Sequence, residues 1–212
     1  LTGSNASLLS QEPGAKLTGR HLDIELFHFD YQEYLKYTKH PASEMSLRQY
    51  LRDGGFPGFL KSQDERTLQQ LLDDIVLRDV AVRHGIREID RLRRMVSFLV
   101  ENIGNRFSAT KMRQPLSLTT TATILQWCAH LSDAYLFAFI PKYSHSLRTQ
   151  QVNPRKTYCI DTGLQYALST TTALDDGRRF ENLVFLALRR KYRQIYYFDD
   201  GAECDFVAID RK

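Results

Sequence analysis

The sequence is poor in cysteine and has no apolar run long enough to cross a membrane. Its three cysteines, Cys128, Cys159 and Cys204, are scattered without paired spacing, which excludes a disulfide framework and a four-cysteine zinc site. The longest uninterrupted apolar run, residues 134–140, is far shorter than the ~20 residues that span a bilayer. We therefore expect a protein of a reducing compartment, the cytoplasm, with no membrane partner.

The sequence also lacks the short motifs that hold phosphates or metals. It contains no GxxxxGK[ST] loop, whose backbone N–H groups would cradle the phosphates of ATP. Its six histidines never fall in HExxH or a similar metal-binding spacing. By itself the chain is therefore not expected to hydrolyse ATP.

What is present is ordinary globular composition. The chain has 212 residues, of which 25% are charged and 42% hydrophobic, with a formal net charge of +4. This length allows one large domain or two small ones, and the composition excludes a fibrous or wholly disordered chain. The sequence opens on Leu1 and closes directly after a strand-like run, so we expect a fragment of a longer protein.

The first half of the chain predicts a strand followed by helices. Apolar and polar residues alternate over residues 21–27, which is typical of a half-buried strand. Asp30, with Glu33 three residues later, predicts a capped helix over residues 31–37. The glycines and proline of residues 54–59 predict a break without regular structure.

Two amphipathic helices are expected next, over residues 68–76 and 89–103. A short helix ended by Pro115, a further helix over 121–131, and strands near 135–140 and 158–160 then follow. Three helices and a hairpin, with the second and third helices joined by a short turn, give the order of a winged helix-turn-helix.

The last segment predicts a helix and a second hairpin. Apolar positions from Phe180 to Ala187 have helical spacing, and the cations from Arg189 to Arg193 suit the C-terminus of that helix. Two strand-like runs, 195–198 and 204–209, flank a turn. The fold class expected for the whole chain is therefore α/β, in the sense of mixed α+β.

A basic surface is a candidate nucleic-acid interface. Residues 78–113 contain nine Lys or Arg and four acids, and such a surface can neutralise phosphates through backbone contacts with DNA. The third helix of the winged helix offers Gln126 as its only good hydrogen-bonding group for base readout. A protein-docking role for the winged helix remains the alternative. The candidate nucleic-acid-binding residues are Arg91, Arg94, Lys111, Arg113 and Gln126.

Acidic residues near the end of the chain are candidate metal ligands. Glu181 lies near a helix start, and Glu203 and Asp205 lie on a strand, so they can converge on a divalent cation such as Mg²⁺. Glu181 and Asp205 are accordingly the candidate catalytic and metal-binding pair. The alternative is that Glu181 favours its helix N-terminus while Asp205 pairs with Arg178 or Arg179.

The opening turn is a candidate nucleotide-sensing element. Ser4 and Asn5 can orient a water near a nucleotide γ-phosphate, and Arg20 can stabilise phosphoryl-transfer charge from a neighbouring subunit. The alternative is a polar turn and a solvated arginine.

Several short motifs occur in one order along nearly the whole chain. They are Thr2-Gly3-Ser4-Asn5-Ala6-Ser7, Leu17-Thr18-Gly19-Arg20, a helix with Glu33, Gly54-Gly55-Phe56-Pro57, Asp74-Ile75, Lys156-Thr157-Tyr158, Asp161-Thr162-Gly163-Leu164, Glu181-Asn182-Leu183-Val184-Phe185 and Glu203-Cys204-Asp205-Phe206-Val207. Each motif is short, but their shared order is specific. The series resembles the AAA-type ATPases of bacteria and archaea that carry a C-terminal nuclease-like domain of unknown function.

The resemblance implies a series of four parts. These are the tail end of a P-loop ATPase core (residues 1–40), a helical linker (41–86), a winged helix (87–150) and a truncated restriction-endonuclease-like α/β domain (151–212). The Walker A and Walker B motifs would precede Leu1. Glu181 and Asp205 would correspond to carboxylates of a PD-(D/E)xK nuclease site, whose ExK strand would follow Lys212.

Three functions follow as expectations. The first is the C-terminal part of an AAA-like ATP-binding protein, acting here as an interaction or regulatory module without ATP turnover; ATP and Mg²⁺ would belong to the full-length protein. The second is a DNA-binding or Mg²⁺-dependent DNA-processing protein, and the third is a transcriptional regulator built on the winged helix. A protein partner or a homo-oligomer is expected in the first case.

Overall fold

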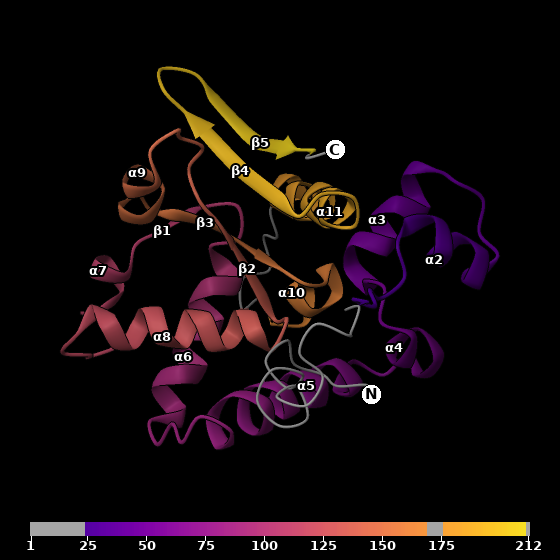
Figure 1. Ribbon diagram of the computed structural model, residues 1–212. Helices are drawn as coiled ribbons and strands as arrows, with labels where there is room; N and C mark the ends of the chain where they lie inside the picture. The colour runs from indigo at the N-terminus through magenta and orange to yellow at the C-terminus, as the bar shows by residue number, and fades with distance from the viewer. Residues whose placement is uncertain (1–23, 169–175, 211–212) are drawn as a thin grey trace, which may run out of the picture.

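The computed structural model describes residues 24–168 and 176–210. In this part the chain is mixed α+β, with helices packed around two small antiparallel sheets (Figure 1). The helices are α2 Tyr31–Thr38, α3 Glu44–Asp53, α4 Pro57–Ser62, α5 Glu65–Asp73, the π-helical η2 Asp74–Val82, α6 Ile89–Glu101, α7 Ala109–Met112, α8 Thr121–Asp133, α9 Leu147–Val152, α10 Thr162–Leu168 and α11 Asp176–Arg189. The strands are β1 Arg106–Phe107, β2 Phe137–Ile140, β3 Arg155–Cys159, β4 Gln194–Asp199 and β5 Glu203–Ile209. Among the described helices, none combines the length and the apolar character that a membrane span requires.

The first helix begins as the sequence predicts, whereas the strand before it is wrong where the structure describes it. An Asp30 oxygen accepts the N–H of Glu33 at 2.8 Å, and Glu33 accepts the N–H of Asp30 at the same distance. Residues 24–27 form no strand, and the side chains of Ile24 and Leu26 are exposed. Alternating residues form a strand only when another strand supplies hydrogen-bond partners, and no described strand pairs with this segment.

The break predicted over residues 54–59 is shorter than expected. Gly54 ends α3 with φ of +72°, but Pro57 is already the first residue of α4. Proline is well accepted at this helix position because its missing N–H would have no partner there. The second half of the predicted break is therefore the first turn of α4.

The two amphipathic helices are confirmed, and their apolar sides lie in the core. The first consists of α5 running directly into η2, and the second is α6, which stops before Gly104 as predicted. Leu72, Val80, Leu92 and Leu99 from these helices belong to one buried apolar cluster that also contains Trp127 of α8.

Strands β1, β3 and β2 form one antiparallel sheet with β3 in the centre. Ile140 of β2 and Arg106 of β1 both lie opposite Lys156 of β3. The predicted hairpin is therefore present, but its connection contains α9, which the sequence did not predict. Since β3 completes this sheet, the structural unit that begins with α6 continues past the predicted boundary at residue 150.

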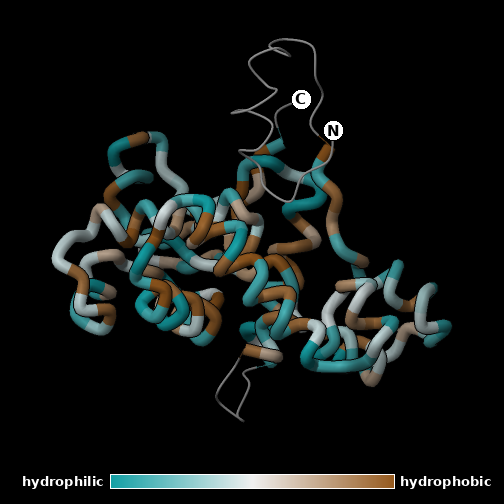
Figure 2. Tube along the Cα trace, turned by 90° about the horizontal axis from the view of Figure 1, so that it is seen from below, coloured by the Kyte–Doolittle hydropathy of each residue, from teal (hydrophilic) through white to brown (hydrophobic). Residues whose placement is uncertain are grey.

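The second sheet is the antiparallel hairpin of β4 and β5, packed beside α11. It is tied to the first sheet by the backbone, because Tyr143 N–H donates to the Tyr197 carbonyl at 2.6 Å and Tyr197 N–H donates to the Pro141 carbonyl at 3.1 Å. Helices α2, α3 and α4 lie at one side of the molecule, opposite α7 and α9 (Figures 1 and 2).

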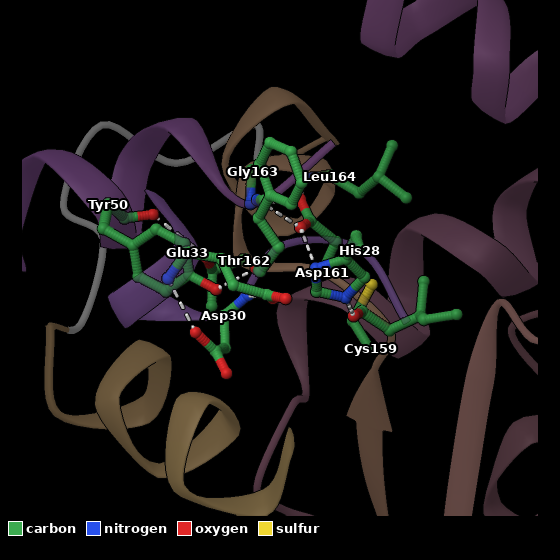
Figure 3. Close-up of polar contacts among 12 residues, drawn as sticks. His28, Asp30, Glu33, Tyr50, Cys159, Asp161, Thr162, Gly163 and Leu164 are labelled. Carbon is green, nitrogen blue, oxygen red and sulfur yellow. Dashed lines mark hydrogen bonds and ion pairs between the residues drawn. The ribbon is translucent and has the colours of Figure 1, made fainter. Parts of the chain in front are cut away.

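Asp161, two residues after the end of β3, joins segments that are distant in sequence. Its carboxylate is fully buried and accepts the N–H groups of Gly55 at 2.8 Å, Gly163 at 2.8 Å and Leu164 at 3.1 Å. Figure 3 shows this carboxylate between the His28 ring and the first turn of α10. Asp161 therefore fixes the α3–α4 junction and starts α10, a helix that the sequence did not predict.

His28 brings the N-terminal segment to the same carboxylate. Its Nδ1 lies 3.2 Å from Asp161 Oδ2, at ion-pair distance but without hydrogen-bond alignment, while its Nε2 contacts the Ile160 carbonyl. Both ring nitrogens therefore face oxygen atoms of the segment that follows β3.

We expect Gly54→Ala to destabilise the fold far more than Gly85→Ala. A Cβ at Gly54 would lie 2.1 Å from Asp161 Oδ1, whereas a Cβ at Gly85 would meet nothing within 4 Å. Both glycines have positive φ, so Gly85→Ala should cost about 1 kcal/mol and Gly54→Ala at least about 3 kcal/mol in urea unfolding. Equal losses for the two variants would contradict the packing around Asp161.

A pair of histidines joins the end of η2 to α8. The rings of His84 and His130 stack with centroids 3.5 Å apart and an interplanar angle of 11°. Burial lowers the pKa of both rings; Arg83 lowers that of His84 further, and His84 lowers that of His130, while Asp133 opposes both shifts.

This pair predicts a loss of stability in mild acid. The folded pKa values lie below the unfolded value of about 6.5, so the unfolded chain binds protons first. The contribution of the pair is therefore complete above pH 6.5 and declines as the pH falls through the lowered pKa values. His130→Gln should flatten the dependence of the unfolding free energy on pH between 7 and 5. An unchanged slope in that variant would show that the pair contributes nothing.

Candidate functional site

Three carboxylates converge on one lysine. The Lys156 Nζ lies 2.6 Å from Asp205 Oδ1, 3.4 Å from Glu181 Oε1 and 3.5 Å from Glu203 Oε1. The Lys156 side chain is only 4% exposed, whereas about half of Asp205 and Glu203 faces solvent. The site is therefore a buried ammonium with an acidic, partly open rim.

The elements of the fold place these groups with little freedom. Lys156 and Tyr158 are two residues apart on β3, so they project from the same face of the central strand. Glu181 comes from α11, and Glu203 and Asp205 come from β5. The Tyr158 hydroxyl donates to Glu181 Oε1 at 2.6 Å. One strand thus contributes both the cation and a neutral hydrogen-bond donor.

Aromatic packing holds α11 and β5 against β3 at this site. The Tyr158 ring stacks on Phe185 at 4.5 Å between centroids and tilts against Phe206 at 5.3 Å. Gly104 leaves room beside them, since a Cβ there would lie 2.9 Å from Glu181 Oε2. The position of the Glu181 carboxylate is therefore defined by packing as well as by charge.

A second cation stands at the edge of the cluster. Arg106 of β1 contacts Asp199 at 2.6 Å and Glu203 at 3.5 Å, and its guanidinium lies over the Tyr197 ring. Lys156 of β3 and Arg106 of β1 therefore both present a positive charge to the hairpin of β4 and β5.

The electrostatic environment fixes the protonation states. Burial alone would lower the pKa of Lys156, but its hydrogen bond to Asp205 and the charge of Glu181 outweigh burial, so the pKa is raised. Burial and the hydrogen bond to Glu181 raise the pKa of Tyr158. At neutral pH the site therefore contains an ammonium and an un-ionised phenol.

The structure brings together Glu181 and Asp205, the two carboxylates that the sequence analysis selected, but their cationic partner is Lys156. Asp205 pairs with Lys156, so the predicted alternative pairing with Arg178 or Arg179 is wrong. Arg179 instead contacts Asp176 at 2.9 Å. Lys156 was visible in the sequence only as part of a motif. Its spacing to Tyr158 on a strand was the available signal for a shared face.

The other sequence candidates fall on separate elements. Arg91 and Arg94 lie on α6, Lys111 and Arg113 lie on and just after α7, and Gln126 lies exposed on α8. Their role in nucleic-acid binding stays a prediction. Ser4, Asn5 and Arg20, the candidate nucleotide-sensing residues, lie outside the described residues.

The described residues contain no group of three or more His, Cys, Asp or Glu side chains arranged to hold a metal ion. Glu181, Glu203 and Asp205 share the ammonium of Lys156 without forming a metal-ligand cluster among themselves.

Comparison with known proteins gives two curated relatives and one family. An uncharacterized protein of Haemophilus influenzae is 30% identical over 221 residues, covering 98% of this chain and 55% of that protein. Uncharacterized protein MJ1544 of Methanocaldococcus jannaschii is 32% identical over 210 residues, covering 90% of this chain and 47% of that protein. The chain thus spans about half the length of these relatives. No solved structure matches it.

Residues 44–175 match the family described as a domain of unknown function, DUF8612. The matched segment runs from the start of α3 through α10 and contains Lys156 and Asp161, but it ends before α11 and the hairpin of β4 and β5. By this match over more than half of its length, the chain belongs to the DUF8612 family.

Proposed function

We propose that this chain is an interaction and regulatory part of a longer ATP-binding protein, and that alone it turns over neither ATP nor nucleic acid. The observation that carries the proposal is the ammonium that lies among the carboxylates. The buried Lys156 ammonium contacts both Glu181 and Asp205, the pair that a metal-dependent reaction would need.

The residues present do not fit a magnesium ion in this arrangement. Mg²⁺ requires oxygen ligands at about 2.0–2.1 Å in near-octahedral geometry. Here the nearest oxygens of Glu181, Glu203 and Asp205 surround the Lys156 ammonium instead, and its charge would repel a divalent cation placed between them. No reaction step is therefore assigned to a metal at this site.

The larger protein context supports the ATP-binding part of the proposal. The curated relatives are about twice as long as the matched region, which leaves length for a nucleotide-binding core in those proteins. The order α6, β1, α7, α8, β2, β3, with β3 central in the sheet, agrees with a winged helix-turn-helix. A winged helix followed by a helix and a hairpin is the series that the resemblance implies.

A second candidate is metal-dependent processing of DNA. The convergence of Glu181 and Asp205 on a single atom favours it, since such sites place two carboxylates side by side. This function would require Lys156 to withdraw from the carboxylates.

We expect Lys156→Met to lower the unfolding free energy by about 2 kcal/mol. Removing one partner of a buried ion pair costs about 3–5 kcal/mol, and the exposure of Asp205 and Glu203 reduces that cost through solvent screening. Lys61→Met removes an exposed lysine of α4 as a matched control and should change stability by less than about 0.5 kcal/mol. Urea unfolding compares them, and a Lys156→Met variant as stable as the control would contradict the account of the site.

The function is tested by assays of turnover. The chain alone should hydrolyse no ATP and should leave plasmid DNA intact in Mg²⁺ or Mn²⁺. The full-length protein should hydrolyse ATP at a rate that Lys156→Met changes and Lys61→Met does not, because only the first variant alters contact between parts of the regulatory module.

Two results would overturn the proposal. ATP hydrolysis by the chain alone would contradict its regulatory role, since turnover would not depend on a separate core. Metal-dependent DNA cleavage that is lost in Asp205→Asn would favour the second candidate.

A further inference from the structure

We propose that the groove between α7, α8 and the β2–β3 connection binds an acidic amphipathic helix of a protein partner. The proposal rests on the interaction role proposed above and names the chemistry of the partner. The groove has a volume of about 580 Å³, in the range of pockets that accept ligand-sized groups, so it can take a few side chains from one helix face.

Charge is distributed unevenly around this groove. Residues 102–160 contain seven Lys or Arg and a single acid, Asp133. Two of these cations, Arg106 and Lys156, contact the carboxylates of the second hairpin. The other five have no ion pair with any residue in the described ranges, and they are Lys111, Arg113, Lys142, Arg148 and Arg155.

Three of these cations belong to elements that line the groove. Thr110 of α7 and Arg155 of β3 line it, Lys111 follows Thr110 directly, and Arg148 lies on α9, whose last residues also line it. The Arg155 charge acts on the Cys128 thiol in the groove wall, where it opposes the rise in pKa that burial causes. The elements around the groove therefore carry three cations without an ion pair in the described ranges, against one acid, Asp133, which lines the groove. This excess of positive charge complements an acidic ligand.

The groove also presents apolar side chains that no described part of the chain covers. Leu125 of α8 and Val152 of α9 line it and are 54% and 73% exposed. Helix α9 buries none of its residues, and its Leu147 is also 73% exposed. A six-residue helix has little stability of its own, so a partner packed on α9 would supply contacts that the chain lacks.

Exposed apolar side chains with cations on the neighbouring elements fit a peptide better than a nucleic acid. Protein–DNA interfaces are strongly polar, and Leu125 and Val152 would face phosphates in such a complex. An amphipathic helix places its apolar residues in a groove and its charged residues at the edge. Acidic residues are the ones that Lys111, Arg148 and Arg155 would attract.

The test is fluorescence anisotropy with two fluorescein-labelled peptides and one duplex. The first peptide has Leu at positions i, i+3, i+4 and i+7 of each repeat and Glu elsewhere; the second has Lys in place of Glu. The third probe is a DNA duplex. We expect saturable, salt-sensitive binding of the Glu peptide and at least tenfold weaker binding of the Lys peptide.

Two double variants locate the binding surface. Leu125→Ala with Arg155→Ala should weaken binding of the Glu peptide about tenfold, because it removes an apolar contact and a cation at the groove. Val82→Ala with Arg94→Ala makes the same changes at exposed positions that do not line the groove, and should leave binding unchanged. Alanine favours helix at position 125, so the first variant should retain the fold.

Three outcomes would overturn the proposal: no saturable binding of the Glu peptide, equal effects of the two double variants, or tighter binding of the duplex at the same surface. The last result would assign the groove to nucleic acid. Failure of peptide binding would leave the turnover assays unaffected, whereas ATP hydrolysis by the chain would overturn the proposed function and not the groove.

Discussion

The buried carboxylate of Asp161 is the contact on which the arrangement of this chain depends. A charge without solvent must be met by donors, and Asp161 takes them from Gly55 and from the first turn of α10. The His28 ring, from a third segment, lies at ion-pair distance from the same carboxylate. A single side chain after β3 therefore sets the positions of the N-terminal segment, the α3–α4 junction and α10 relative to the central sheet.

Strand β3 connects the buried Asp161 carboxylate with the candidate site. Asp161 lies two residues after the end of β3, and Lys156 and Tyr158 on that strand face α11 and β5. The same strand thus anchors one half of the molecule through a carboxylate and the other half through an ammonium. This explains how the sheet of β1, β2 and β3 and the second hairpin share one buried cluster.

Local features of the fold could be predicted, because neighbouring residues determine them. The cap formed by Asp30 and Glu33, the apolar stripe of α6 and the hairpin of β4 and β5 all follow from short patterns. The predicted strand was wrong over residues 24–27, the part that the structure describes, because a strand also needs a partner. Helix α9 was missed because it buries no apolar residue, and so it has no periodic signal.

The candidate site could be predicted only in part for the same reason. Glu181 and Asp205 were found as acids on a helix and a strand, but their partner Lys156 is 25 and 49 residues away in sequence. Such a pairing depends on which strand is central in the sheet, and local periodicity does not contain that information. Sequence therefore predicted the acids of the site without its cation.

The central claim is that Lys156 acts as the cation of the carboxylate site. The most direct measurement is an NMR titration of the ¹⁵N-labelled chain with Mn²⁺, which broadens the amide signals near a bound ion. The account predicts no saturable broadening at Glu181, Glu203 and Asp205, because the ammonium already occupies the space between them. Saturable broadening centred on these three residues in the unaltered chain would contradict it.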